Sequence, residues 1–163
     1  MTGDLSAIEP LRPDHSTADF DCGKPPISNW LKSHALDHQN RSISRSYVVH
    51  RSGRVVGFYA LAMASIEHEA ATKKIKRGLP GYPIPAALLA QLGVDVSEQN
   101  THLGAALLKD AIFRAARLAD EIGARIILVH ALDDEARSFY EHFGFQPSPT
   151  NDLHLMLRLA RDT

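Results

Sequence analysis

The sequence predicts a mixed α/β domain built on one β-sheet, and two features carry that prediction. Segments with apolar residues at every third or fourth position, as in amphipathic helices, alternate with short segments rich in β-branched and aromatic residues, as in strands. Glycine and proline fall between these segments, where they end one element and begin the next. Because 163 residues is typical of one domain, we expect a single domain over residues 1–163.

The N-terminal half is expected to hold one helix and a β-hairpin. Residues 25–40 show helical spacing, and the two prolines at their start suit a first helical turn. Residues 46–50 and 55–63 flank a turn that carries Gly53, which favours two antiparallel strands. The basic and then Gly- and Pro-rich stretch 67–85 predicts a loop, with room for a short helix at its start.

The C-terminal half is expected to alternate strands and helices. Its longest apolar helix ends at a glycine, and its next strand is apolar throughout, as in a strand buried on both faces. The expected order is a short helix-like piece leading into a buried strand with Leu92, Val94 and Val96, a polar turn over 97–102, a helix after Leu103 with Gly123 just past its end, a strand over 125–130, a helix capped by Asp133 and ended by Gly144, and a strand over 153–159.

Composition excludes several classes of protein. Hydrophobic residues make up 44% and charged residues 23%, as in an average globular protein. The single cysteine, Cys22, excludes an internal disulfide framework and a Cys-rich zinc site. Without a secretion signal or a long apolar run, we expect a cytoplasmic protein with no membrane partner. The formal net charge of −1 means that any nucleic-acid site must be local.

The polar turn before the longest helix is a candidate phosphate site. Gly104, Ala105 and Ala106 open that helix, so backbone N–H groups are exposed where an anion can approach. An ordinary strand-to-helix turn remains the alternative.

Two motifs together resemble one enzyme family. The polar turn contains Gln99-Asn-Thr-His-Leu-Gly104, and the later helix contains Phe139-Tyr-Glu-His-Phe-Gly-Phe145. They resemble the GNAT acetyltransferases, with a pyrophosphate loop Arg/Gln-x-x-Gly-x-Gly/Ala and a later Phe-Tyr-x-x-x-Gly-Phe. The similarity to the toxin branch of type II toxin–antitoxin modules rests on Trp30-Leu31, Lys76-Arg77 before Pro83-Ile-Pro85, Leu88 to Asp95, and Val129-His-Ala-Leu132.

The resemblance implies a GNAT fold and an enzyme that uses acetyl-CoA to acetylate the α-amino group of aminoacyl-tRNA, which blocks translation. It also implies a ribbon-helix-helix antitoxin, DNA contact only through that complex, and a homodimer. Tyr140 is the implied catalytic acid, which protonates the leaving thiolate. The implied cofactor residues are Leu92, Gly93 and Val94 along the pantetheine arm, and Gln99, Asn100, Thr101, His102, Leu103, Gly104 and Ala105 around the pyrophosphate.

Three positions depart from the toxin pattern. Asn100 and His102 stand where this branch usually has glycine, and Gln91 stands where it commonly has arginine. A histidine forced to a positive φ costs stability, although a protonated imidazole would add a cation near phosphate. Without the arginine at position 91, either the strength of tRNA binding or the geometry of the active-site wall is expected to differ from the toxin pattern.

Charge and amine chemistry bear on the acceptor. The one dense basic run supplies candidate tRNA contacts at Lys73, Lys74, Lys76 and Arg77, with a solvated loop as the alternative. At pH 7 an α-amine is roughly 14% neutral and a lysine amine roughly 0.04%, so an α-amine needs little help from a base. No metal is expected, because His34 and His38 lack a third ligand.

Two other functions stay open at this point. One is an acetyltransferase for peptide N-termini or a small amine. The other is a degenerate, non-catalytic subunit that binds a partner or regulates.

Overall fold

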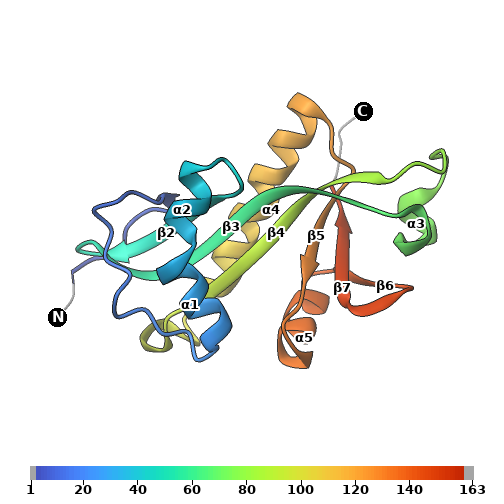
Figure 1. Ribbon diagram of the computed structural model, residues 1–163. Helices are drawn as coiled ribbons and strands as arrows, with labels where there is room; N and C mark the ends of the chain where they lie inside the picture. The colour runs from blue at the N-terminus through green and yellow to red at the C-terminus, as the bar shows by residue number, and fades with distance from the viewer. Residues whose placement is uncertain (1–2, 160–163) are drawn as a thin grey trace. The chain divides into compact units, whose positions relative to one another are not determined.

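The computed structural model describes residues 3–159, so residues 1–2 and 160–163 of the expected domain lie outside the described part. Its mixed sheet has seven strands (Figure 1), in the order β1 (Glu9–Pro10), β2 (Arg45–Arg51), β3 (Arg54–Ile66), β4 (Ile84–Val94), β5 (Ile126–His130), β7 (Asn151–Arg158) and β6 (Gln146–Ser148). The helices are α1 (Pro25–Ser33), α2 (Ala35–Asn40), α3 (Lys73–Lys76), α4 (Leu103–Ile122) and α5 (Asp134–His142), with 3-10 turns η1 (His68–Ala70) and η2 (Val96–Glu98). The expected mixed α/β fold is confirmed.

The chain divides into two compact units, each of which takes part of the sheet. The first unit comprises Met1–Ala62 with Ala90–Ala111, and the second comprises Met63–Leu89 with Ile112–Thr163. Within residues 3–159, no helix combines the length and the apolar character needed to cross a membrane.

The first unit is organised around the predicted hairpin. Strands β2 and β3 pair antiparallel, and Arg51 lies opposite Arg54 across the turn. Both turn residues, Ser52 and Gly53, have positive φ (50° and 88°), as a two-residue type I′ turn requires. The core of this unit combines residues of the hairpin, the N-terminal segment and both short helices: Leu11, Phe20, Cys22, Leu31, Ala35, Val48, Val55 and Phe58.

The single helix expected over residues 25–40 is two helices. The residue between them, His34, has φ −125° and ψ −27°, outside the helical region. Trp30 of α1 stacks on Phe58, with ring centroids 6.1 Å apart and planes at 11°, so its indole is a core anchor of this unit. The predicted end before Arg41 is confirmed.

The second unit contains the parallel strand pair of the sheet. Strand β4 pairs parallel with β5 from Ala86↔Ile126 to Leu89↔Val129, and β7 pairs antiparallel with both β5 and β6. One core cluster of this unit includes Ile75 of α3 and side chains of three strands; its members are Ala71, Ile75, Ile84, Ala86, Ile126, Leu128 and Met156.

The prediction of a helix-like piece at the start of residues 86–96 is wrong. The segment is strand from Ile84 to Val94, while Val96 lies in η2 and is 54% exposed. A short apolar run fits a buried helix or a buried strand equally well by periodicity, and here parallel pairing with β5 decides for the strand.

Candidate active site

A buried carboxylate fixes the point where the chain leaves β4. Asp95 is 1% exposed, and its side chain accepts hydrogen bonds from the amides of Asp21 (2.9 Å) and Ser97 (3.0 Å) and from the Ser97 hydroxyl (2.6 Å). Burial opposes ionisation of Asp95, but these hydrogen bonds outweigh it and lower its pKa. The start of the predicted pyrophosphate loop is therefore held by a charged anchor.

The Gln99 side chain also holds this loop. Its Nε2 donates to the carbonyl oxygens of Cys22 (2.9 Å) and Val94 (3.1 Å). The preceding residue, Glu98, accepts two hydrogen bonds from the Arg51 guanidinium, at 2.9 and 3.1 Å. Because the side-chain amide of Gln99 is hydrogen-bonded within the protein, only the backbone N–H of this residue can contact an anion.

Residues 100–102 form the turn before α4, and two of them have a left-handed backbone. Both Asn100 (φ 65°) and His102 (φ 66°) are left-handed, and Thr101 between them is not. Alternation of this kind turns successive N–H groups toward one concave side. These are the two positions at which the sequence replaces the glycines of the toxin pattern.

Helix α4 begins directly after this turn. The first N–H groups of a helix have no partner within the helix, and the small residues Gly104 and Ala105 leave them accessible. The turn and helix start thus bring all the residues predicted for the pyrophosphate, 99–105, into one loop, and the donors present fit a pyrophosphate group.

The predicted pantetheine residues form the end of β4. Gly93 faces the interior of the first unit: a Cβ there would lie 2.9 Å from Ile27 Cγ2 and 3.3 Å from Phe58 Cε1. Glycine at this position therefore lets α1 pack closely on β4. Leu92 and Val94, on either side, are half-buried.

Tyr140 lies in the second unit on α5. Asp133 caps this helix by accepting a hydrogen bond from the Ala136 amide (2.9 Å), as the sequence predicted. The Tyr140 ring is 6% exposed and packs edge-on to Phe139 and at a tilt to Phe145, with centroids 5.2 and 5.6 Å away. Burial raises the pKa of Tyr140, so at neutral pH the phenol keeps a proton that it can donate.

The basic run lies on and after α3. Thr72 caps this helix at the amide of Ile75, and the buried Ile75 side chain anchors it in the core of the second unit. The Lys76 side chain is half-buried; the exposed members of the run are Lys73, Lys74 and Arg77. The short anchored helix thus presents the charges that the sequence assigned to tRNA.

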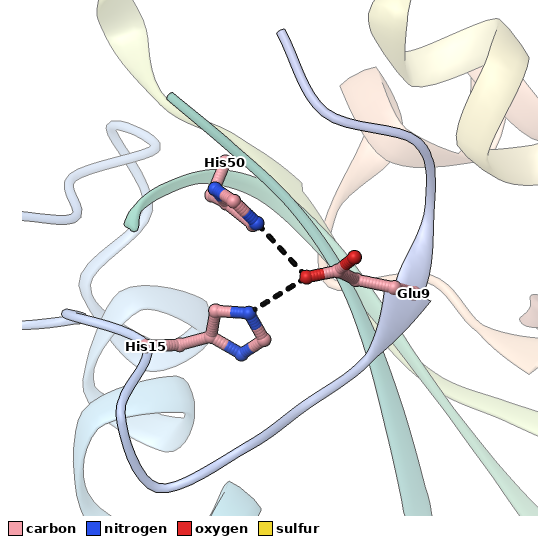
Figure 2. A group of neighbouring side chains, drawn as sticks. All are labelled: Glu9, His15 and His50. Atoms are coloured by element: carbon pink, nitrogen blue, oxygen red, sulfur yellow. Dashed lines mark hydrogen bonds and ion pairs between the residues drawn. The ribbon is translucent and has the colours of Figure 1, made fainter. Parts of the chain in front are cut away.

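A cluster that the sequence did not indicate joins Glu9, His15 and His50 (Figure 2). Glu9 Oε1 lies 2.9 Å from Nε2 of each histidine and 3.0 Å from the Arg12 guanidinium. The hydrogen bond to His15, then that to His50, lowers the pKa of Glu9 to about 2. Glu9 and His15 are six residues apart but His50 is 41 residues from Glu9, so no local motif marks the cluster.

The other ring nitrogens of this cluster oppose metal binding. His15 Nδ1 accepts from the Arg12 amide (2.9 Å) and His50 Nδ1 accepts from the Gly53 amide (3.0 Å), so each ring carries its proton on Nε2. A metal at Nε2 would move that proton to Nδ1, where a ligating histidine normally donates to an oxygen. The cluster instead fits a hydrogen-bonded tie between the N-terminal segment and the hairpin.

Comparison with known proteins identifies the family of this chain. A family model described as acetyltransferase (GNAT) domain matches residues 42–147. The chain belongs to the GNAT acetyltransferases and is an N-acetyltransferase, which confirms the resemblance seen in the sequence.

Relatives similar to this chain include toxins within this family. A tRNA-acetylating toxin of Mycobacterium tuberculosis is 51% identical over 138 residues, 85% of this chain and 82% of the relative. A probable toxin TacT of Sinorhizobium fredii is 34% identical over 164 residues, 94% and 91% of the two chains. Among solved structures, AtaT complexed with acetyl-methionyl-tRNAfMet matches with a TM-score of 0.88 and 28% identity over 95% of each chain.

Proposed function

We propose that this protein is a toxin that transfers acetyl from acetyl-CoA to the α-amino group of aminoacyl-tRNA and so blocks translation. One observation supports the proposal: a turn with two left-handed residues, Asn100 and His102, comes directly before α4 in a chain 51% identical to a tRNA-acetylating toxin. AtaTR has been solved bound with acetyl-CoA, at 27% identity to this chain. The predicted single GNAT domain over residues 1–163 is part of this proposal.

The cofactor residues have defined roles in the proposal. Acetyl-CoA supplies the activated acetyl thioester. The backbone of Gln99 to Ala105 holds the pyrophosphate, and the end of β4, Leu92 to Val94, lies along the pantetheine arm. Asn100 and His102 contribute through their left-handed backbone.

Tyr140 is the proposed catalytic acid. The neutral α-amine attacks the thioester carbonyl, the C–N bond forms, and the C–S bond breaks as the thiolate leaves. The Tyr140 phenol donates its proton to that thiolate, the amine proton passes to water, and the phenolate regains a proton from water, which restores the acid. Because burial raises the pKa of Tyr140, the phenol is protonated at neutral pH and holds the proton that this step requires.

We infer the partners of this protein from those of similar proteins. Lys73, Lys74, Lys76 and Arg77 contact tRNA phosphates in this proposal. AtaT structures include a complex with the C-terminus of the antitoxin AtaR and an AtaT–AtaR complex bound to DNA. We propose by analogy an antitoxin of the ribbon-helix-helix type, DNA contact through the complex only, a homodimer, and a cytoplasmic location.

Labelled acetyl-CoA and charged tRNA test the function directly. The expected result is labelled N-acetyl-aminoacyl-tRNA. If the protein bound acetyl-CoA and yet gave no such product, the acceptor assignment would be wrong. Acetylation of free peptides or small amines in place of charged tRNA would identify the broader acetyltransferase, and no binding of acetyl-CoA would identify a non-catalytic subunit.

The Tyr140→Phe variant tests the acid. It keeps the ring packing on Phe139 and Phe145 and loses only the phenolic proton. We expect a folded protein that binds acetyl-CoA and no longer inhibits growth in cells without antitoxin. Unchanged growth inhibition would remove Tyr140 from the mechanism.

A further inference from the structure

The second unit contains a small open pocket that shares only Lys74 with the residues of the proposed function. Its volume is about 100 Å³. Residues from three separate stretches line it, including Lys74 and Ile75 of α3, Gly144 and Gln146 at the start of β6, and Met156 and Arg158 of β7.

The charges around this pocket have one sign. Lys74 and Arg158 are its two cations, and no Asp or Glu lines it. Within residues 3–159, neither cation forms an ion pair with an acidic side chain. Their positive potential is therefore directed at the pocket without compensation from a lining carboxylate, which favours an anion.

The pocket floor strengthens that preference. Ile75 is 3% exposed and Met156 is 1% exposed, so apolar side chains back the site. Charges that face an apolar wall interact more strongly than charges surrounded by water. The Gln146 side chain adds a neutral amide that can donate a hydrogen bond.

Size and donor geometry favour a phosphate group. One water needs about 10–15 Å³ of such volume, so this pocket holds several waters or one group with four oxygens. A guanidinium binds phosphate with two parallel hydrogen bonds, and a lysine adds a mobile point charge. Lys74 is also part of the basic run, so the pocket is continuous with the surface proposed for tRNA.

We propose that this pocket binds one backbone phosphate of the tRNA substrate, with Arg158 and Lys74 on the same phosphate. The proposal rests on the proposed function and adds Arg158, Gln146 and the pocket to its binding surface. The sequence could indicate Lys74 through the basic run but gave no signal for Arg158, because only the fold brings α3 and β7 together.

Salt dependence of binding provides the test. Binding of charged tRNA is measured at a series of salt concentrations for the wild type, Arg158→Gln, Lys74→Gln and the double variant. One phosphate contact contributes about 0.7–0.9 to the slope of log K against log salt. We expect the double variant to lose about one such contact and not two, because both cations share one phosphate, and to bind roughly tenfold more weakly at low salt.

Three controls separate charge from folding. Arg158→Lys keeps the charge and should keep most of the slope. Lys109→Gln removes an exposed charge from α4 and should leave both slope and affinity unchanged. Acetyl-CoA affinity should be the same in every variant, because no pocket residue belongs to the proposed cofactor loop.

Inorganic phosphate distinguishes a free anion site from a tRNA site. Phosphate should shift the backbone amide NMR signals of Gly144 and Gln146 in the wild type and not in Arg158→Gln. Phosphate binding with an unchanged tRNA slope would overturn the tRNA assignment, as would variants that lose antitoxin affinity but keep tRNA affinity. If wild-type protein binds acetyl-CoA but no charged tRNA, the proposed function fails, and the tRNA assignment with it. The phosphate titration then decides whether the pocket binds anions at all.

Discussion

His102 occupies a backbone conformation that residues with a Cβ adopt at a cost. Its φ of 66° is left-handed, a region that costs most L-residues about 1–2 kcal/mol and that glycine occupies freely. We expect His102→Gly to raise the free energy of unfolding by up to about 1 kcal/mol, since glycine's greater freedom in the unfolded chain offsets part of the gain. Urea denaturation measures this difference.

Asn100 is the matched position for that experiment. It has nearly the same φ, 65°, but asparagine tolerates the left-handed region better than other non-glycine residues. Asn100→Gly should therefore gain less than His102→Gly. If the histidine is a burden on the loop, His102→Gly should also bind acetyl-CoA more tightly in a titration; weaker binding would show that the imidazole assists the pyrophosphate.

Glu9 makes a pH-dependent contribution to stability. Its folded-state pKa of about 2 is below its ordinary value of 4.5, first because of the hydrogen bond from His15 and then that from His50. The contribution of a depressed carboxyl pKa is complete above the ordinary value and is lost as pH falls through the folded value. Thermal unfolding should therefore show an advantage of wild type over Glu9→Gln at pH 5 that shrinks toward pH 2. Parallel curves for the two proteins across that interval would contradict this prediction.

Gly93 determines whether α1 can pack on β4. A methyl group there would lie 2.9 Å from Ile27 and 3.3 Å from Phe58, both closer than ordinary contact, and 3.4 Å from Cys22. We expect Gly93→Ala to lower the free energy of unfolding by about 1–3 kcal/mol, the usual cost of overpacking a core. Gly81→Ala is the control, because nothing lies within 4 Å of a Cβ at that position. Equal stability of the two variants would show that α1 moves away at little cost.

Elements set by local signals could be predicted from the sequence. Helix α4 has a regular apolar stripe and Gly123 at its end, helix α5 has the Asp133 cap, and the hairpin has Gly53 in its turn. Elements set by pairing could not. Whether residues 86–89 form strand depends on pairing with β5, and the two-residue strand β1 depends on pairing with β2.

The residues of the candidate site likewise fall into two groups: those marked by local motifs and those that depend on contacts between distant segments. The roles of residues 99–105 and Tyr140 could be predicted because their motifs are contiguous in sequence. The Gln99 side chain could not be placed, because its acceptors include the carbonyl of Cys22, 77 residues away. The Glu9 cluster and Arg158 likewise depend on contacts between distant segments.

The net charge of the whole molecule limits how the proposed tRNA binding can arise. A formal charge of −1 gives the protein no general attraction for RNA, so affinity must come from a few local cations. Lys73 and Arg77 are exposed members of the basic run outside the Arg158 pocket. Their contacts with phosphate should therefore add to that of the pocket.

The double variant Lys73→Gln with Arg77→Gln tests this account. We expect the KM for charged tRNA to rise about tenfold at low salt, and the salt slope to fall by up to about 1.5, because two phosphate contacts are lost. The kcat and the KM for acetyl-CoA should stay at wild-type values, since phosphate contacts position the substrate and take no part in acetyl transfer. Initial rates with labelled acetyl-CoA at varied tRNA and salt measure all three quantities. An unchanged KM for tRNA would mean that the run is a solvated surface and that recognition lies elsewhere; a fall in kcat alone would place these residues in the chemical step.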